Sequence, residues 1–360
     1  MKKLWKNKTT RKNALTYAVV TVAFVVMQLL SEFGMLGSAM KGYLVPLCAY
    51  IVMAVSLNLL VGVCGELSLG HAGFMGIGAF SGIVAAAVLR DVIPDATLRL
   101  TAAMFIGGIM AGVFGFLIGI PALRLRGDYL AIVTLAFGEI LKNVFGNLYV
   151  GLDVEGLHAS VSSGNVELLE GGKMILDGPV GATGIQKLST FPMGFALILF
   201  TLFVVLNLIN SKEGRAIKAV RDNRIAAESV GINVTAFRMK AFVVSAFLAG
   251  MAGTLFGLNF SSMQASKFNF NSSINILVFV VLGGMGNILG SVISTTVLYI
   301  LPEAMRGLDD YRMIMYAVVL IIVMLCTWSP AVKNTLQVFG MNVRKLAAKL
   351  FGKKEVGSNG

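Results

Sequence analysis

The 360-residue sequence has few charged residues: Asp, Glu, Lys and Arg make up 13% of it, while hydrophobic residues make up 56%. A soluble domain carries about 25% charged residues. The charges that are present lie mostly at the ends of long apolar runs. This composition excludes an ordinary soluble domain and predicts a protein that crosses a membrane several times.

Cysteine and histidine are also scarce. The three cysteines, Cys48, Cys64 and Cys326, lie far apart, within or at the edge of apolar runs. Such positions are typical of small buried side chains and exclude a disulfide framework. The two histidines, His71 and His158, cannot form a metal site alone. We therefore expect no metal and no other cofactor.

Motifs for enzyme chemistry are absent from the sequence. The segment EGGKM (residues 170–174) lacks the first glycine and the hydroxyl residue of a phosphate-binding loop. No nucleophile elbow, zinc motif or dinucleotide fingerprint occurs either. A membrane-embedded enzyme would need a polar catalytic cluster, which the sequence does not supply. We therefore expect no ATP hydrolysis by this chain and no enzyme activity of its own.

Apolar runs near 20 residues long, the length that crosses a bilayer, recur along the chain. The uninterrupted runs are residues 14–30, 43–63, 72–89, 100–120, 129–150, 191–209, 239–260 and 311–328. A further run, 274–301, is broken by GGMGN (residues 283–287) and predicts two short helices. We expect an all-α polytopic helical bundle with about ten membrane segments, some of them half-length or broken.

The distribution of charge predicts the orientation. The net charge is +12, and basic segments stay in the cytoplasm by the positive-inside rule. The tails 1–13 and 331–360 and the loop 210–238 are basic, whereas the loop 151–190 is acidic. We expect a transmembrane domain over 14–330, both termini and the 210–238 loop cytoplasmic, and the 151–190 loop external. No basic domain with interleaved aromatics occurs, so we expect no nucleic-acid partner.

The segment RAIKAVRDNRIAAESVG (residues 215–231) interrupts the apolar chain with strong helix formers and no proline. Gly231 suits the left-handed stop of a helix, with Ile232 packing back on it. Asn233 or Thr235 can cap the next helix. The segment predicts one or two short helices on the cytoplasmic face. The alternative is a solvated loop that only sets topology.

The same segment resembles the cytoplasmic loop of ABC importer permeases, which carries an acidic residue, two alanines, three variable residues and a glycine. Ala226, Ala227 and Gly231 match this pattern, whereas Ile225 stands where the acidic residue would be and Glu228 follows instead. Further motifs resemble the branched-chain amino acid permease family, most specifically its LivM-type members. They are NLLVGVCGELSLGHAGFMGIGAF (58–80), ALRLRGDYLAIVTLAFGEILK (122–142), GPVGATGI (178–185), GRAIKAVRDNRIAAESVGINV (214–234) and VFVVLGGMGNILG (278–290).

The resemblance implies a permease subunit of an ATP-driven importer in the bacterial cytoplasmic membrane. The implied partners are a second, related permease, two ATP-binding subunits, an extracytoplasmic binding protein, and leucine, isoleucine or valine as substrate. In this family the cytoplasmic loop couples the permease to its ATPase, and arginines there can pair with carboxylates on the partner. The implied coupling residues are Arg215, Arg221, Arg224, Ala226, Ala227, Glu228 and Gly231.

Polar residues and glycines inside the apolar runs are candidates for the transport pathway, because polar groups are costly in lipid. One group lies in GELSLGHAGF and another in GGMGN, where glycines allow a broken helix whose backbone lines a pathway. The candidates are Glu66, Ser68, His71, Glu139, Gly283, Gly284 and Asn287. A tight cytoplasmic turn is the alternative for Glu66, Ser68 and His71. Pairing with Lys142 at i+3 is the alternative for Glu139.

Two other functions remain open from the sequence. A urea, sugar or nucleoside permease would share the same scaffold. A proton- or sodium-coupled carrier would use Glu139 and Glu66 and would work without an ATPase, although the sequence has no chain of buried carboxylates for a proton relay.

Overall fold

The computed structural model describes residues 8–34, 37–125, 127–153, 156–161 and 172–305, together with a few positions between 311 and 321. The chain divides into two compact units, Met1–Ile300 and Leu301–Gly360, and the fold described below is that of the first. The predicted tail 331–360, and most of the predicted span 311–328, lie outside the described residues.

Seven helices of the described part are long and apolar enough to cross a membrane, and each overlaps one predicted span. They are α1 (Lys8–Glu32), α2 (Ser38–Asn58), α3 (His71–Val88), α4 (Ala96–Ala122), α5 (Asp128–Gly146), α6 (Phe191–Asn210) and α9 (Val234–Gly257). Helix α2 continues into a π-helix, η2 (Leu59–Cys64). Side-chain caps mark where two of these helices begin: Asp95 accepts from Thr97 N, and Asn233 accepts from Ala236 N.

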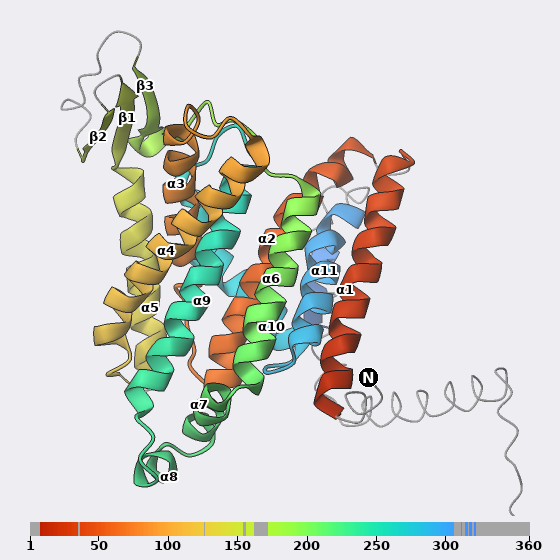
Figure 1. The fold of residues 1–360 in the computed structure, drawn as a ribbon, viewed down its shortest axis with the longest axis vertical. Coiled ribbons are helices and arrows are strands. Elements are labelled where there is room, and N and C mark those ends of the chain that lie inside the picture. The colour runs from red at the N-terminus through yellow and green to blue at the C-terminus, as the bar shows by residue number, and fades with distance from the viewer. Residues whose placement is uncertain are drawn as a thin grey trace, which may run out of the picture. The chain divides into compact units, whose positions relative to one another are not determined.

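The core forms where α9 packs against α2, α3 and α4 (Figure 1). Small residues bring these helices into backbone contact: a Cβ at Gly78 would collide with Gly250, and one at Gly253 would collide with the backbone of Met75. Thr254 Oγ1 also donates to the carbonyl of Gly78 at 2.8 Å. Close packing of small residues is how membrane helices associate where lipid removes the hydrophobic driving force.

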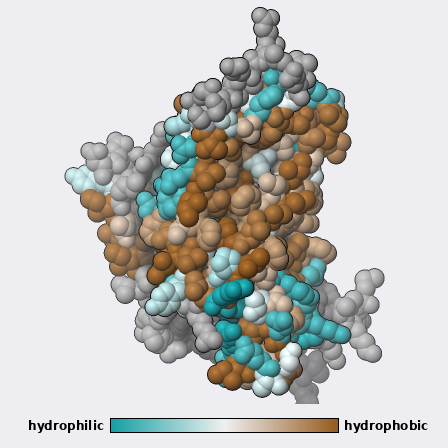
Figure 2. Space-filling model, turned by 90° about the vertical axis from the view of Figure 1, so that its left-hand side faces the viewer, coloured by the Kyte–Doolittle hydropathy of each residue, from teal (hydrophilic) through white to brown (hydrophobic). Residues whose placement is uncertain are grey.

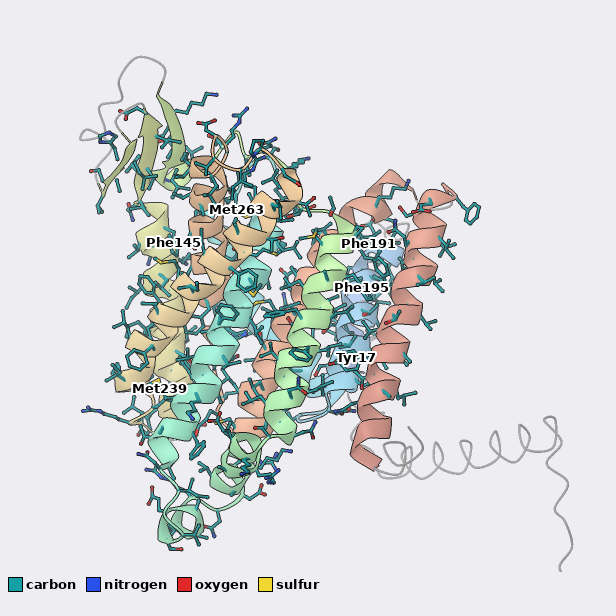
Figure 3. All side chains as sticks on the ribbon, viewed as in Figure 1. Tyr17, Phe145, Phe191, Phe195, Met239 and Met263 are labelled. Carbon is teal, nitrogen blue, oxygen red and sulfur yellow. The ribbon has the colours of Figure 1, made fainter. Side chains whose placement is uncertain are left out.

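Aromatic side chains join more distant elements (Figure 3). Phe24 of α1 stacks on Phe195 of α6, with 3.9 Å between the ring centroids, and on Phe191 at 5.0 Å. Phe145, near the end of α5, stacks on Phe80 of α3 at 4.8 Å. These contacts attach α1 to α6 and α5 to α3.

The predicted break at GGMGN is confirmed as the turn of a helical hairpin. Helix α10 (Phe270–Gly283) ends at Gly284, whose φ is +90°, and α11 (Ile288–Ala304) follows. Ser294 Oγ of α11 donates to Phe279 O of α10 at 2.5 Å. The left-handed glycine lets the chain reverse between two short helices, as the sequence predicts.

A four-stranded antiparallel sheet lies in the segment between α5 and α6, and the all-α prediction is wrong here. The strands are β1 (Tyr149–Asp153), β2 (Gly156–Ser160), β3 (Lys173–Asp177) and β4 (Gly181–Ala182), in the order β2-β1-β3-β4. Val150 pairs with Ala159 on one side and with Leu176 on the other. The predicted span 129–150 therefore ran too far, because its last apolar residues begin β1 and not a helical turn.

Loops join the sheet to the end of α9. Ala182 and Met263 exchange backbone hydrogen bonds (2.8 and 2.9 Å), and Leu188 N donates to Leu258 O at 3.1 Å. Short 3-10 helices, η4 (Gly178–Val180) and η5 (Ala265–Phe268), complete this side. We call it the sheet end of the bundle. The two short helices α7 (Lys212–Asp222) and α8 (Arg224–Ser229) lie at the opposite end, which we call the α7–α8 end (Figure 1).

The hydropathy of the surface differs between the middle of the bundle and its ends. Figure 2 shows hydrophobic residues across the middle of one face and hydrophilic residues gathered at its lower end, where α7 and α8 lie in Figure 1. This distribution is the one expected of a bundle whose middle contacts lipid and whose ends contact water.

Candidate functional site

Helix α7 packs against the end of α6. Ser211 Oγ caps it by accepting from Gly214 N at 3.1 Å, and its buried face is formed by Gly214, Ile217 and Val220. Two basic side chains of α7 turn back toward α6. Arg215, a predicted coupling residue, donates from Nη1 to Asn210 O at 3.4 Å, and Lys218 Nζ donates to Ile209 O at 3.2 Å. Cations stabilise these free carbonyls and the negative end of the helix dipole.

Helix α8 begins directly after α7, so of the predicted one or two short helices the structure has two. Asn223 Oδ1 caps it by accepting from Ala226 N at 3.0 Å. Ala227 is buried in a small cluster with Val220 and Val234, against which Ile232 packs. Ala227 therefore holds α8 onto the protein itself, and of the predicted alanine pair only Ala226 is exposed.

The predicted stop at Gly231 is confirmed in detail. Its φ is +82°. Gly231 N donates to Glu228 O and Ile232 N donates to Ala227 O, both at 3.0 Å. These two bonds form a Schellman motif, which satisfies the last carbonyls of α8 and turns the chain toward Asn233 and α9.

Two large apolar side chains are exposed at α8, one in the helix and one directly after it, which the sequence reasoning missed. Ile225 is 80% exposed and Val230 is 73% exposed, although both lie at the hydrophilic end of the bundle. Ala226 is exposed beside them. The signal was present in the sequence, because Ile225 occupies the place of an acidic residue in the matching pattern. Large apolar side chains exposed together in a polar surrounding mark an interaction surface.

The other predicted coupling residues have partners within this chain. Arg224 Nε pairs with Glu228 Oε1 at 3.0 Å along α8. Arg221 pairs with the neighbouring Asp222 at 2.8 Å, and its Nη1 donates to Gly62 O at 2.8 Å. Arg221 thus connects α7 to the membrane helices.

Residues 59–70, which we call the first glycine break, interrupt the membrane helices between α2 and α3. The π-helix η2 ends at Gly65, whose φ is +78°. The stem of Arg221 lies against Gly65, so a Cβ there would come within 2.6 Å of Arg221 Cγ. At the far end of the break, Leu69 N donates to Thr134 Oγ1 at 3.1 Å. A Cβ at Gly70 would collide with the carbonyl of Thr134.

The second glycine break, residues 283–287, lies against the first. A Cβ at Gly62 would collide with Gly286 N. Asn58, fully buried, binds this turn with both ends of its amide: its Oδ1 accepts from Gly286 N and its Nδ2 donates to Ser291 Oγ, each at 2.7 Å. The structure thus brings the two predicted breaks together. Asn58 was not predicted, although an amide inside an apolar run signals a buried polar contact.

Glu66 forms an ion pair inside the bundle. Its Oε1 lies 2.5 Å from Arg238 Nε, and the two side chains are 16% and 4% exposed. Arg238 Nη1 also donates to Leu123 O at 2.9 Å, which attaches the end of α4. This buried ion pair gives Glu66 a structural role, as the alternative of a tight turn also would.

Ser68 and His71 are buried beside the first break. His71 Nε2 lies 2.8 Å from Ser56 Oγ, whose hydroxyl donates to Met53 O at 2.9 Å. Within the described residues, His71 Nδ1 and Ser68 Oγ have no hydrogen-bond partner.

Glu139 lies on α5 and pairs with Lys142, the alternative that its i+3 spacing raised. Its other oxygen accepts from Phe270 N at 3.1 Å, at the first residue of α10. A carboxylate at the start of a helix binds free N–H groups there. The geometry therefore gives Glu139 a structural partner on each carboxylate oxygen.

Asn287, another predicted pathway residue, lies at the second break. Its backbone carbonyl accepts from Ser291 N.

Among the cavities in the described part, two have similar volumes. One, of about 810 Å³, lies at the sheet end and has charged residues in its lining, among them Arg90, Asp91 and Lys173. The other, of about 820 Å³, is an apolar groove between α3, α4 and α5. No three His, Cys, Asp or Glu residues among those described lie together as a metal site would require.

Comparisons with known proteins agree with the motifs. Residues 39–326 match the family described as branched-chain amino acid transport system / permease component. LivM, the high-affinity branched-chain amino acid transport system permease protein of Escherichia coli (strain K12), is 33% identical over 294 residues. That alignment covers 78% of this chain, and this chain spans 66% of the length of LivM.

Other relatives are more distant. LivH, a permease protein of the same kind of system in Salmonella typhimurium, is 26% identical over 282 residues, or 77% of this chain and 88% of LivH. LsrC, an autoinducer 2 import system permease protein of Enterobacter sp. (strain 638), is 29% identical over 170 residues, or 44% of this chain and 50% of LsrC. No solved structure matched the chain.

Proposed function

Because the chain belongs to the family of permease components of branched-chain amino acid transport systems, we propose that it is the membrane-spanning permease subunit of an ATP-binding-cassette importer. It translocates leucine, isoleucine and valine across the bacterial cytoplasmic membrane by alternating access. Its partners are a second related permease, two ATP-binding subunits and an extracytoplasmic binding protein.

The observation that carries the proposal is the exposure of two large apolar side chains at the hydrophilic end of the bundle, Ile225 in α8 and Val230 directly after it. A short helix that is capped at both ends and has exposed apolar side chains near its start and its end suits docking into a groove on a partner. The helix α7 beside it contacts the end of α6 and the first glycine break. A partner that moves α8 would therefore move the membrane helices with it.

The orientation follows from charge. We place the α7–α8 end and both termini in the cytoplasm, because the 210–238 loop and the two tails are basic. The sheet end then faces outward, where the loaded binding protein docks. The polar cavity beside the sheet, with cationic and anionic groups in its lining, suits the arrival of a zwitterionic amino acid.

A different cargo on the same scaffold is the second candidate, and the similarity to LsrC favours it. It predicts the same partners and the same α8 contact, so only the transported solute separates the two. Urea, sugars and nucleosides are therefore included as competitors in the uptake assay. Competition by one of them, without competition by isoleucine or valine, would support this candidate.

The test compares two substitutions of exposed valines at opposite ends. Val230→Asp places a charge directly after α8, where Val230 is 73% exposed, whereas Val180→Asp places the same charge at the sheet end, where Val180 is 53% exposed. The tagged chain is expressed with its partners and purified in detergent, and uptake of labelled leucine is measured in parallel. The Val230→Asp variant should no longer co-purify with the ATP-binding subunit, and its leucine uptake should be at least tenfold lower than that of the unmodified chain. Burying an unpaired charge at a docked face costs several kcal/mol.

Val180→Asp should keep the ATP-binding subunit. If the unmodified chain brings no ATP-binding subunit and its uptake follows an ion gradient, the proposal is wrong. If both variants retain the subunit equally, α8 is not the docking face.

A further inference from the structure

The two glycine breaks and α7 meet at one peptide group. Gly62 lies in η2, its carbonyl accepts from Arg221 Nη1 at 2.8 Å, and its Cα faces Gly286 with no room for a Cβ. Gly286 lies in the turn between α10 and α11, and Arg221 comes from α7. A displacement of α7 along this hydrogen bond therefore acts on both breaks.

The geometry of Gly62 explains why it needs Arg221. The last carbonyls of a helix have no partner within it. At the end of η2, Leu60 O accepts from Glu66 N and also from Gly65 N, whereas Gly62 O is bonded by the guanidinium. A hydrogen bond from a charged donor is among the stronger ones a protein makes. Single turns of π-helix occur frequently at functional sites.

Several contacts orient the guanidinium, although the Arg221 side chain is 40% exposed. Arg221 Nε and Nη2 both donate to Asp222 Oδ1, at 3.0 and 2.8 Å. The stem of Arg221 packs on Gly65, so the side chain is oriented at its base and at its tip. A side chain oriented in this way transmits a displacement, whereas a free surface arginine would absorb it by changing rotamer.

Within the bundle, Asn58 connects the helix that contains Gly62 to the second glycine break. It lies one turn before Gly62 on the same face of the helix, and its amide binds Gly286 N and Ser291 Oγ. The amide is fully buried, where losing one of its two partners would be costly. The second break therefore follows the movement of η2.

We propose that Arg221 is a positioning residue that makes the two glycine breaks move with α7, and that these breaks together form the gate at the α7–α8 end of the pathway. This assigns Arg221 to a contact inside the chain, in place of the carboxylate on the ATPase that the sequence predicts for it. The inference rests on the proposed function, because it requires an ATPase that moves α7.

The test measures the coupling ratio, the number of leucine molecules transported per ATP hydrolysed, in proteoliposomes that contain the whole importer. Arg221→Met keeps the apolar stem on Gly65 and removes every donor. Arg221→Lys restores one charged donor. Lys212→Met makes the same type of change on the same helix at an exposed position, and serves as the matched control.

We expect Arg221→Met to keep the complex and its ATP hydrolysis while the coupling ratio falls about tenfold to a hundredfold, the equilibrium shift that the loss of a charged hydrogen bond produces. Arg221→Lys should recover part of the ratio, and Lys212→Met should leave it unchanged. Ser291→Ala, which removes the hydrogen bond from Asn58 Nδ2 to Ser291 Oγ, should lower the coupling ratio by itself. Combined with Arg221→Met, it should add little further loss, because both act on one connection.

Three results would overturn the inference. Loss of the ATP-binding subunit from Arg221→Met would make Arg221 a docking residue. If Arg221→Met has a coupling ratio within twofold of the unmodified chain, Arg221 does not transmit the movement of α7. If the losses from Arg221→Met and Ser291→Ala are fully additive, the two residues do not act through one connection. If instead the unmodified complex does not transport leucine with ATP, the proposed function itself fails.

Discussion

At the scale of single residues, the pair of Glu66 and Arg238 places two charges in a bundle where charge is costly. Both side chains are largely buried. Glu66→Gln should lower the free energy of unfolding in detergent by about 3 kcal/mol, because it leaves the Arg238 charge without its counter-ion. Denaturant titration followed by circular dichroism measures this loss.

Glu213→Gln is the matched control for that substitution. Glu213 also pairs with a cation, Lys240, but both side chains are about half exposed (47% and 48%). An exposed pair contributes roughly 0–1 kcal/mol. Equal losses in the two variants would mean that the Glu66 contact is no more than a surface pair.

Sequence reasoning at this scale singled out residues more readily than it predicted their partners. Glu66 and Glu139 could be singled out because a carboxylate in an apolar run is costly unless it is paired or functional. The pairing of Glu139 with Lys142 could be expected from local spacing. The pairing of Glu66 with Arg238 could not, because it depends on how α9 crosses the first glycine break.

At the scale of single elements, the end of α8 depends on one backbone conformation. A Cβ at Gly231 would meet nothing within 4 Å, yet its φ is +82°. Gly231→Ala should therefore cost about 1–2 kcal/mol through backbone strain alone. We expect the amides of residues 224–234 to exchange with deuterium at least fivefold faster, as measured by mass spectrometry.

Gly146→Ala is the control for the backbone effect. Gly146 also has open space around its missing side chain, and its φ is not in the left-handed region. It should show no such acceleration near its own helix end. A Gly231→Ala variant with unchanged exchange would mean that the Schellman motif does not hold α8 in place.

The elements also differ in how well the sequence predicts them. The glycine break at 283–287 could be predicted, because three glycines and an asparagine in a run of five residues destabilise a regular helix. The sheet could not, since β1 and β3 are five residues each and lie next to a long apolar run. A short apolar strand and the end of a helix give the same hydrophobic signal.

At the scale of the whole molecule, the question is the source of energy. An ion-coupled carrier needs a carboxylate that releases and binds its ion during the cycle. Glu139 is engaged by Lys142 and by Phe270 N, and glutamine keeps an acceptor for the latter. Glu139→Gln should keep ATP-driven uptake of leucine within about threefold of the unmodified chain, the change that losing one partly exposed ion pair produces.

The measurement is uptake into vesicles loaded with ATP, with and without an ionophore. Uptake should persist when the ion gradient is collapsed. Uptake that is lost with the gradient, and lost again in Glu139→Gln with the complex intact, would favour the carrier.

The sequence by itself located the seven long apolar helices of the described part to within a few residues, and it predicted the two breaks and the family. Apolar length, charge at helix ends and glycine spacing are properties of neighbouring residues. Only the tertiary structure decided which distant groups meet. Gly286 N and Asn58 are 228 positions apart, and Arg221 and Gly62 are 159 apart. Contacts of that separation depend on helix packing, in which a single glycine determines whether two backbones can touch.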